Sequence, residues 1–171
     1  MTTDERERPD GLAGEREMLE GWLEFHRATL AAKCAGLDGE QLRATSVPPS
    51  DLSLLGLVRH LAEVERGWFR RVLAGEDVPR IYCTGADPDG DWHPAEDDTW
   101  EEAYATWQGE IARARELAAA TPSLDAVGAR RHRTGTAHNL RWIYTHMIEE
   151  YARHNGHADL IRERIDGAAG E

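Results

Sequence analysis

Three polar residues interrupt the apolar face of a predicted long helix, and their types are those that bind metal ions. The stretch from Asn139 to Asp166 is predicted to be one helix because its apolar residues recur at alternating steps of three and four. Its inward face consists of Leu140, Ile143, Met147, Glu150, His154, His157 and Ile161. Both ends of this face are apolar, but its middle carries a carboxylate and two imidazoles. Burying such groups without a partner costs several kcal/mol, so we expect a ligand, most simply a metal ion.

Glu150 and His154 are four residues apart, so their side chains point from the same face of the helix and can reach a single ion. The alternative is that the histidines are hydrogen-bonded residues of the core or of a pocket rim, and this helix alone leaves both interpretations open. A ligand from a second helix favours the metal site. His60, beside the apolar face of the predicted helix from Leu52 to Gly75, supplies that ligand chemically.

Two further histidines are candidates for catalytic roles. His157, on the same helix, and His26, on the apolar face of the predicted first helix, are expected to support the ligands or to transfer protons. Their alternative role is a hydrogen bond to a neighbouring group inside the protein. The aromatic residues expected beside a bound cofactor are Trp68, Trp92 and His93. The last two lie in a long acidic connection, residues 75–98, and are expected to fold over the mouth of the site.

The same connection has an aspartate pattern that resembles a calcium-binding loop. Asp87, Asp89 and Asp91 alternate as EF-hand ligands do. However, Trp92 stands where an EF-hand requires glycine, and Asp98 stands where it requires a bidentate glutamate. We therefore interpret the segment as a solvated loop.

Four stretches with helical spacing of apolar residues predict an all-α fold. They are about Glu15 to Ala35, Leu52 to Gly75, Thr99 to Leu117 and Asn139 to Asp166. Their connections predict an up-down four-helix bundle with a long loop between the second and third helices. We expect a flexible N-terminus at residues 1–11 and a single domain at residues 12–167. The basic cluster at residues 130–133 is expected to be a solvated connection.

The overall charge narrows the classes of partner. The 171 residues include 32 acidic and 20 basic ones, which gives a formal net charge of −12 that repels phosphate backbones, so we expect no nucleic-acid partner.

No signal peptide or apolar run of transmembrane length is present, and the two cysteines lack metal-site spacing, so we expect a cytoplasmic protein without membrane contact. Nucleotide-binding, serine-hydrolase and HExxH motifs are absent, as are the two Glu-x-x-His pairs of di-iron bundles.

Two runs resemble the DinB-like superfamily of metal-binding four-helix bundles: LSLLGLVRHLAEVERGWF at residues 52–69 and HMIEEYARHNGHADLIRERIDG at residues 146–167. They are most similar to the actinobacterial branch related to mycothiol-dependent maleylpyruvate isomerase. Many DinB-like proteins bind metal through a histidine on helix two and an HxxxH pair on helix four. Here Glu150 takes the first place of that pair, as in the isomerase. The resemblance therefore implies a DinB/YfiT-like fold with His60, Glu150 and His154 as metal ligands.

Two imidazoles and a carboxylate match a zinc site that keeps a fourth position open, although nickel, iron or manganese also suit these ligands. A thiol in the open position would become a nucleophilic thiolate, and the resemblance implies mycothiol as that thiol. The sequence thus predicts a metal-dependent enzyme that acts on a small-molecule electrophile, either by transferring the thiol to this electrophile or by isomerising the electrophile. A water in the same position would instead give a hydrolase. The absence of the isomerase's additional C-terminal domain favours a non-catalytic metal- or small-ligand-binding bundle, and a homodimer that buries Trp faces also stays open.

Overall fold

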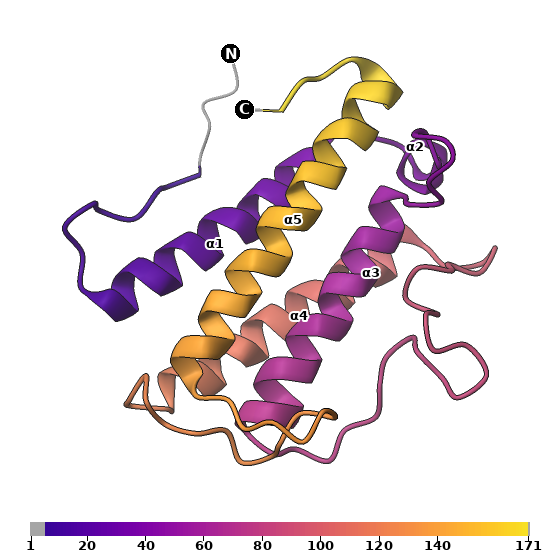
Figure 1. Cartoon of the computed structure of the whole chain (residues 1–171). Coiled ribbons are helices and arrows are strands. Elements are labelled where there is room, and N and C mark those ends of the chain that lie inside the picture. Colours follow the sequence, from indigo (N-terminus) through magenta and orange to yellow (C-terminus); the bar gives the residue numbers. More distant parts are fainter. Residues whose placement is uncertain (1–5, 171) are drawn as a thin grey trace.

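The computed structural model describes residues 6–170, in which helices are the only extended regular elements (Figure 1). These elements are α1 (Glu15–Cys34), α2 (Gly39–Arg43), α3 (Leu54–Glu65), the π-helix η1 (Arg66–Leu73), α4 (Trp100–Ala119) and α5 (Leu140–Asp166). An isolated antiparallel bridge joins Val127 to Asn139, and no strand occurs in the described residues. The prediction of an all-α fold is therefore confirmed.

The helices begin where their capping residues predict. The side chain of Ser53 accepts a hydrogen bond from the third backbone N–H of α3, and Thr99 and Asn139 do the same for α4 and α5. At the end of α5, Gly167 adopts a φ of 79°, a left-handed conformation that glycine reaches without strain. These local signals fix the ends of α5, the helix that carries most of the polar residues predicted to do chemistry.

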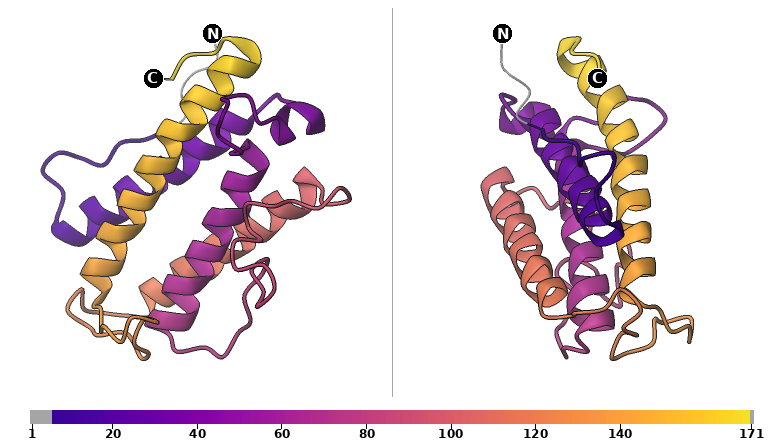
Figure 2. Two further views of the ribbon diagram at one scale, coloured as in Figure 1. Left: turned by 45° about the vertical axis from the view of Figure 1, so that its right-hand side comes forward. Right: turned by 90° about the vertical axis from the view of Figure 1, so that its left-hand side faces the viewer.

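Helices α1 and α5 lie side by side and run in the same direction (Figures 1 and 2). Glu15, at the start of α1, pairs with Arg141 at the start of α5, at 2.6 Å. Lys33, near the end of α1, pairs with Asp159 in the last turns of α5, at 2.7 Å. His60 lies against His154 and Trp68, further along the chain, lies against Trp142, so α3–η1 runs antiparallel to α5 and therefore also to α1.

Helix α4 is parallel to the α3–η1 rod, which a strictly alternating up-down order does not allow. Arg59 in α3 pairs with Asp98 just before α4 at 2.6 Å, and Arg66 further along pairs with Glu110 at 2.5 Å. The predicted alternation is wrong here because residues 74–99 cross back along the molecule before α4 begins (Figure 2). A long crossover permits parallel neighbours, whereas a short turn forces antiparallel ones.

All four long helical rods contribute to one core. The fully buried large side chains include Leu23, Leu30, Leu57, Leu61, Phe69, Trp107, Ile111, Leu140 and Tyr151. A polar chain crosses this core: Trp107 Nε1 donates to Tyr151 Oη at 2.8 Å, and Tyr151 Oη donates to Glu65 Oε1 at 2.8 Å. Glu65 also receives two hydrogen bonds from Arg27, so each of these four buried side chains has a hydrogen-bond partner.

The helix predicted from Leu52 to Gly75 changes its hydrogen-bond pattern halfway. From Arg66 it continues as η1, and the N–H of Ala74 bonds the carbonyl of Phe69, five residues back. Such wide turns rotate the following side chains relative to a regular α-helix and occur often at functional sites. Trp68 and Arg71, both on η1, line the cleft described below.

Residues 6–14 lie against α1. The guanidinium carbons of Arg6 and Arg8 are each 5.6 Å from the centre of the Phe25 ring, and Pro9 packs closely against Gly21. The rest of the predicted flexible N-terminus, residues 1–5, lies outside the described residues. None of the helices in the described part of the chain is long and apolar enough to cross a membrane.

Candidate metal centre

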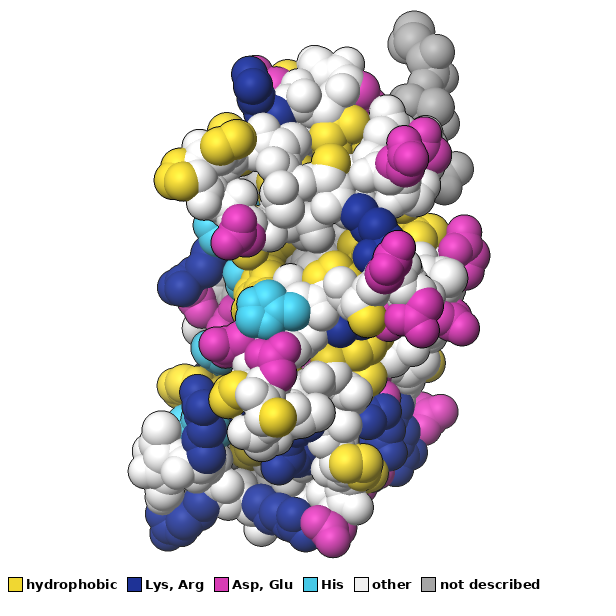
Figure 3. Space-filling model, turned by 90° about the vertical axis from the view of Figure 1, so that its right-hand side faces the viewer, with side chains coloured by type: hydrophobic (Ala, Val, Ile, Leu, Met, Phe, Trp, Pro, Cys, Tyr) yellow, Lys and Arg dark blue, Asp and Glu magenta, His cyan; other side chains and the backbone are white. Residues whose placement is uncertain are grey.

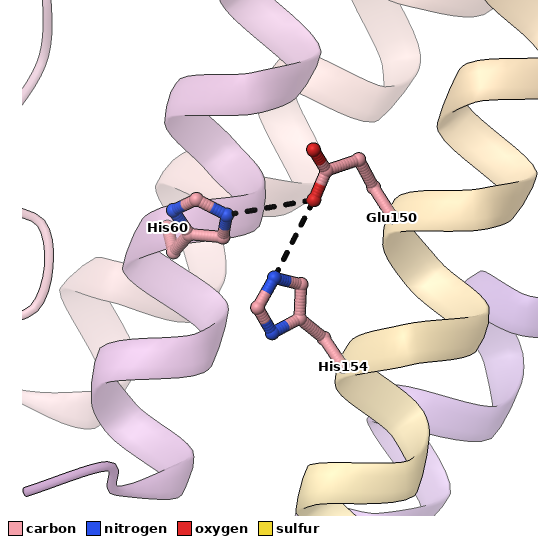
Figure 4. A group of neighbouring side chains, drawn as sticks. All are labelled: His60, Glu150 and His154. Carbon is pink, nitrogen blue, oxygen red and sulfur yellow. Dashed lines mark ion pairs between the residues drawn. The ribbon is translucent and has the colours of Figure 1, made fainter.

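Three predicted ligands converge between α3 and α5. His60 of α3 faces Glu150 and His154, which lie one turn apart on α5 (Figure 4). The Nε2 atoms of His60 and His154 are 3.8 Å and 3.4 Å from Glu150 Oε2. One ligand atom from each residue lies within 4.8 Å of the other two. The antiparallel packing of α3 on α5 thus supplies the third donor that α5 alone lacks.

These separations suit a shared cation better than direct hydrogen bonds. A hydrogen bond between nitrogen and oxygen spans about 2.7–3.2 Å, which is shorter than both distances to Glu150. Around a tetrahedral zinc ion with bonds of about 2.0–2.1 Å, neighbouring ligand atoms lie about 3.3 Å apart. The cluster of His60, Glu150 and His154 therefore has the donor types and nearly the spacing of a divalent metal site.

Asp91 holds His60 in the orientation that such a site requires. Its Oδ2 lies 2.7 Å from His60 Nδ1, and its Oδ1 accepts a hydrogen bond from Cys83 Sγ at 3.3 Å. Because an ionised carboxylate only accepts hydrogen bonds, His60 Nδ1–H donates to Asp91, and Nε2 is the nitrogen directed at Glu150. A carboxylate behind a ligand histidine fixes the ring and makes it a better donor.

The connection at residues 74–99 is anchored beside the site rather than fully solvated. Asp91 is only 5 % exposed, so the interpretation of this segment as a solvated loop is wrong at that position. Buried Arg59 donates to the backbone carbonyls of Gly90 at 2.7 Å and Asp91 at 3.2 Å. Trp92 then stacks on His60, with ring centres 4.2 Å apart and planes 21° apart. The aromatic ring thereby covers one side of the ligand cluster.

The electrostatics of the cluster favour a cation. Burial lowers the pKa of His60, but its contacts with Asp91 and Glu150 outweigh burial and leave that pKa raised. His154 and His60 hold the pKa of Glu150 far below its ordinary value, so this carboxylate is ionised. Burial acts to raise the pKa of Asp91, yet the contacts with His60 and Cys83 bring it below the ordinary value. Two carboxylates therefore stay ionised beside two imidazoles.

The remaining predicted histidines occupy three different surroundings. His157 Nδ1 lies 3.2 Å from His154 Nδ1, while His154 Nε2 faces Glu150. His157 is therefore in contact with a candidate ligand and lies outside the group of His60, Glu150 and His154. His26 lies on α1 with its Nδ1 3.4 Å from Asn155 Nδ2, and it does not line the cleft. The side chain of His93 is 64 % exposed and pairs with a loop aspartate outside the cleft.

His146 lies at the site but was not predicted from the sequence. Its Nε2 lies 3.4 Å from Glu150 Oε1, the oxygen that is not directed at the ligand cluster. Together with Glu149 the pair forms a second group of closely spaced metal-ligand atoms. The predicted inward face stepped from Ile143 to Met147 and so passed by His146. A step of four residues back from Glu150 is the signal that would have found it.

An open cleft of about 770 Å³ extends from the ligand cluster along α3, η1 and α5. Its wall is aromatic. Trp142 stacks on His146, with ring centres 4.9 Å apart and planes 18° apart, and Trp68 meets the same imidazole edge-on at 4.8 Å. Trp68 also stacks on His132 at 4.9 Å. Trp92 and Trp68 were both predicted to contact a cofactor, and both line this cleft. Trp92 lies beside the ligand cluster, and Trp68 lies further along the cleft.

Most of the chain that builds this site matches a known family. The sequence model described as mycothiol-S-transferase matches residues 18–167, which include all three candidate ligands. The chain belongs to the mycothiol-S-transferase family. This DinB-like family agrees with the resemblance found in the sequence, while the maleylpyruvate isomerase branch is not specified by the match. No curated protein matches the chain significantly.

Proposed function

We propose that this member of the mycothiol-S-transferase family is a metal-dependent enzyme that transfers mycothiol to small-molecule electrophiles. In this proposal His60, Glu150 and His154 hold one divalent ion, with zinc the best fit to the donor types. The observation that carries the proposal is the convergence of these donors within the segment that matches the family. The fold is proposed to be a DinB-type four-helix bundle made of α1, α3–η1, α4 and α5.

A divalent ion bound there would favour the thiolate form of mycothiol, which is the nucleophilic form. The protein's own residues prepare the site for this chemistry. Asp91 keeps His60 Nε2 directed at the position of the ion, at a hydrogen-bond distance of 2.7 Å. Trp92 stacks on His60 and excludes water from that side of the cluster. His157, whose Nδ1 lies 3.2 Å from His154 Nδ1, holds the ring of that ligand in place, and the thiol proton passes to solvent.

The cleft leaves room for two reactants. Its volume of about 770 Å³ lies within the range of small-molecule sites, about 300–1,000 Å³. The ligand cluster lies at one end of the aromatic wall, so a thiol bound there leaves the wall free for the electrophile. Holding both molecules in one cleft replaces a bimolecular encounter by a reaction between neighbours.

Metal content and thiol conjugation, measured on the same preparations, test the proposal. The purified protein should contain one divalent ion and conjugate mycothiol with a neutral electrophile such as methyl 4-chloro-3-nitrobenzoate. His154→Ala should lose stoichiometric metal binding and conjugation. His157→Ala should keep the ion and only slow conjugation, and the exposed control His93→Ala should behave like the wild type. Tight binding of one ion by His154→Ala would show that the assignment of ligands is wrong.

A further inference from the structure

The end of the cleft beyond the aromatic wall is strongly basic. Five arginines line the cleft, namely Arg71, Arg80, Arg130, Arg131 and Arg133, and all but Arg80 come from η1 or from the segment bonded to it. Within the described part of the chain, the side chains of Arg71, Arg80 and Arg133 have no ion-pair or hydrogen-bond partner. This is unexpected in a chain with 32 acidic and 20 basic residues, where carboxylates are plentiful. Figure 3 shows histidines along one edge of this side of the molecule and Lys and Arg side chains gathered toward its lower end.

The segment that carries three of these arginines is held firmly against η1. The N–H groups of Ala129 and Arg130 donate to the carbonyls of Leu73 and Val72, at 3.0 and 3.1 Å. A Cβ on Gly128 would lie 2.7 Å from the Val72 carbonyl oxygen, so only glycine allows this approach. Arg130, Arg131 and Arg133 are exposed, in line with the interpretation of this segment as a solvated connection, and they also line the cleft.

The acidic residues of the same cleft do not neutralise these arginines. Glu63 accepts hydrogen bonds from the backbone N–H groups of residues 81 and 82. Asp91 is bonded to His60 and Cys83, and Glu150 belongs to the ligand cluster. Asp89 has no bond to an arginine. The cleft thus has an acidic end at the candidate metal centre and a cationic end across the aromatic wall.

The wall between the two ends presents flat aromatic surface. Trp142 is 41 % exposed although it stacks on His146, which is unusual for so large an apolar side chain. Trp68 stacks on His132 and touches Trp142, with ring centres 4.9 Å apart. Contacts therefore run without a break from Glu150 through His146 and the two tryptophans to His132, next to the arginines. Such a surface favours a planar ring.

We propose that the electrophile is a planar aromatic or conjugated molecule that carries a carboxylate. This inference rests on the proposed function and adds the class of its second substrate. The ring lies on the wall formed by Trp68 and Trp142, and the carboxylate binds Arg71 and Arg133, whose guanidinium groups match its two oxygens. The reacting carbon is then directed toward the ligand cluster and the thiol.

A pair of probes that differ mainly in charge tests this inference. The acid 4-chloro-3-nitrobenzoate and its methyl ester both react by aromatic substitution: the sulfur–carbon bond forms, the carbon–chlorine bond breaks, chloride leaves with the bonding electrons, and the thiol proton passes to solvent. We expect kcat/KM with mycothiol, divided by the uncatalysed rate, to be at least about tenfold higher for the acid than for the ester, since one charge-assisted pair is worth about a factor of ten.

The double variant R71Q/R133Q should remove this preference, so that the ratio of acid to ester turnover falls to about one. The control is Arg113→Gln, because Arg113 lies on α4, pairs with Glu76 and does not line the cleft. Binding of the acid without thiol, followed by quenching of tryptophan fluorescence, should weaken about tenfold in the double variant only.

The outcomes separate the two proposals. Equal use of acid and ester by the wild type, or an unchanged preference in R71Q/R133Q, would overturn the anionic substrate while mycothiol transfer stands. Absence of conjugation with either probe would overturn the transferase proposal. In that case arginine-dependent binding of the acid would still support an anion site, and equal binding of acid and ester would overturn it too.

Discussion

Replacing Glu65 with glutamine should strongly destabilise the protein, because the change leaves a buried guanidinium without its main counter-charge. Glu65 is fully buried, and Arg27 is 5 % exposed. The carboxylate accepts from Arg27 Nε at 2.8 Å, from Arg27 Nη2 at 2.6 Å and from Tyr151 Oη at 2.8 Å. Glutamine has nearly the same shape, but it turns an NH₂ group toward one of these donors.

The expected magnitude follows from the burial of the pair. Breaking a buried ion pair from one side costs about 3–5 kcal/mol. Arg27 has a second partner, Glu24, at 2.7 Å, but this side chain is 41 % exposed and compensates only part of the charge. We therefore expect a loss near the lower end, about 3 kcal/mol. For a domain of this size each kcal/mol lowers Tm by about 2–4 °C, so Tm should fall by about 6–12 °C.

Thermal and urea unfolding followed by circular dichroism, at a fixed metal concentration, measure this loss. Glu24→Gln is the matched control, because it removes the half-exposed partner of the same arginine and should cost at most about 1 kcal/mol. The double change R27M/E65L, which replaces both charges with apolar groups, should recover most of the stability. If Glu65→Gln and Glu24→Gln unfold alike, burial of the pair does not control its energy and the reasoning is refuted.

Two smaller changes test the supports of the cleft. Asp91→Asn should weaken metal binding by about 10–100-fold in a competition titration, because Asp91 holds the ring of His60. Asp89→Asn, at an exposed aspartate without that contact, should leave the metal affinity unchanged. Equal affinities of the two variants would contradict the role of Asp91. Gly128→Ala should destabilise the fold by about 1–3 kcal/mol in urea, since its Cβ would meet a backbone oxygen at 2.7 Å. Gly85→Ala, which has open space, should change stability by less than about 0.5 kcal/mol, and a similar loss in both would speak against close packing at Gly128.

Local signals in the sequence determined the helices and part of the site. The apolar spacing and the caps at Ser53, Thr99 and Asn139 depend on contacts within a few residues, so they could be read without the fold. The same holds for Glu150 and His154, because a spacing of four places both side chains on one helical face. His60 was a candidate only through its chemistry and a resemblance to a family.

The tertiary structure decided what surrounds those residues. The crossover at residues 74–99 makes α4 parallel to α3 and brings Asp91 behind His60, and no periodic pattern encodes a contact across 31 positions. His146 became visible only when its ring met Glu150, because its place on the helix is shared with solvent-facing residues. The arginines at residues 130–133 looked like a solvated connection in the sequence. Their place in the cleft depends on long-range backbone hydrogen bonds to η1, and such contacts exist only once the helices have packed.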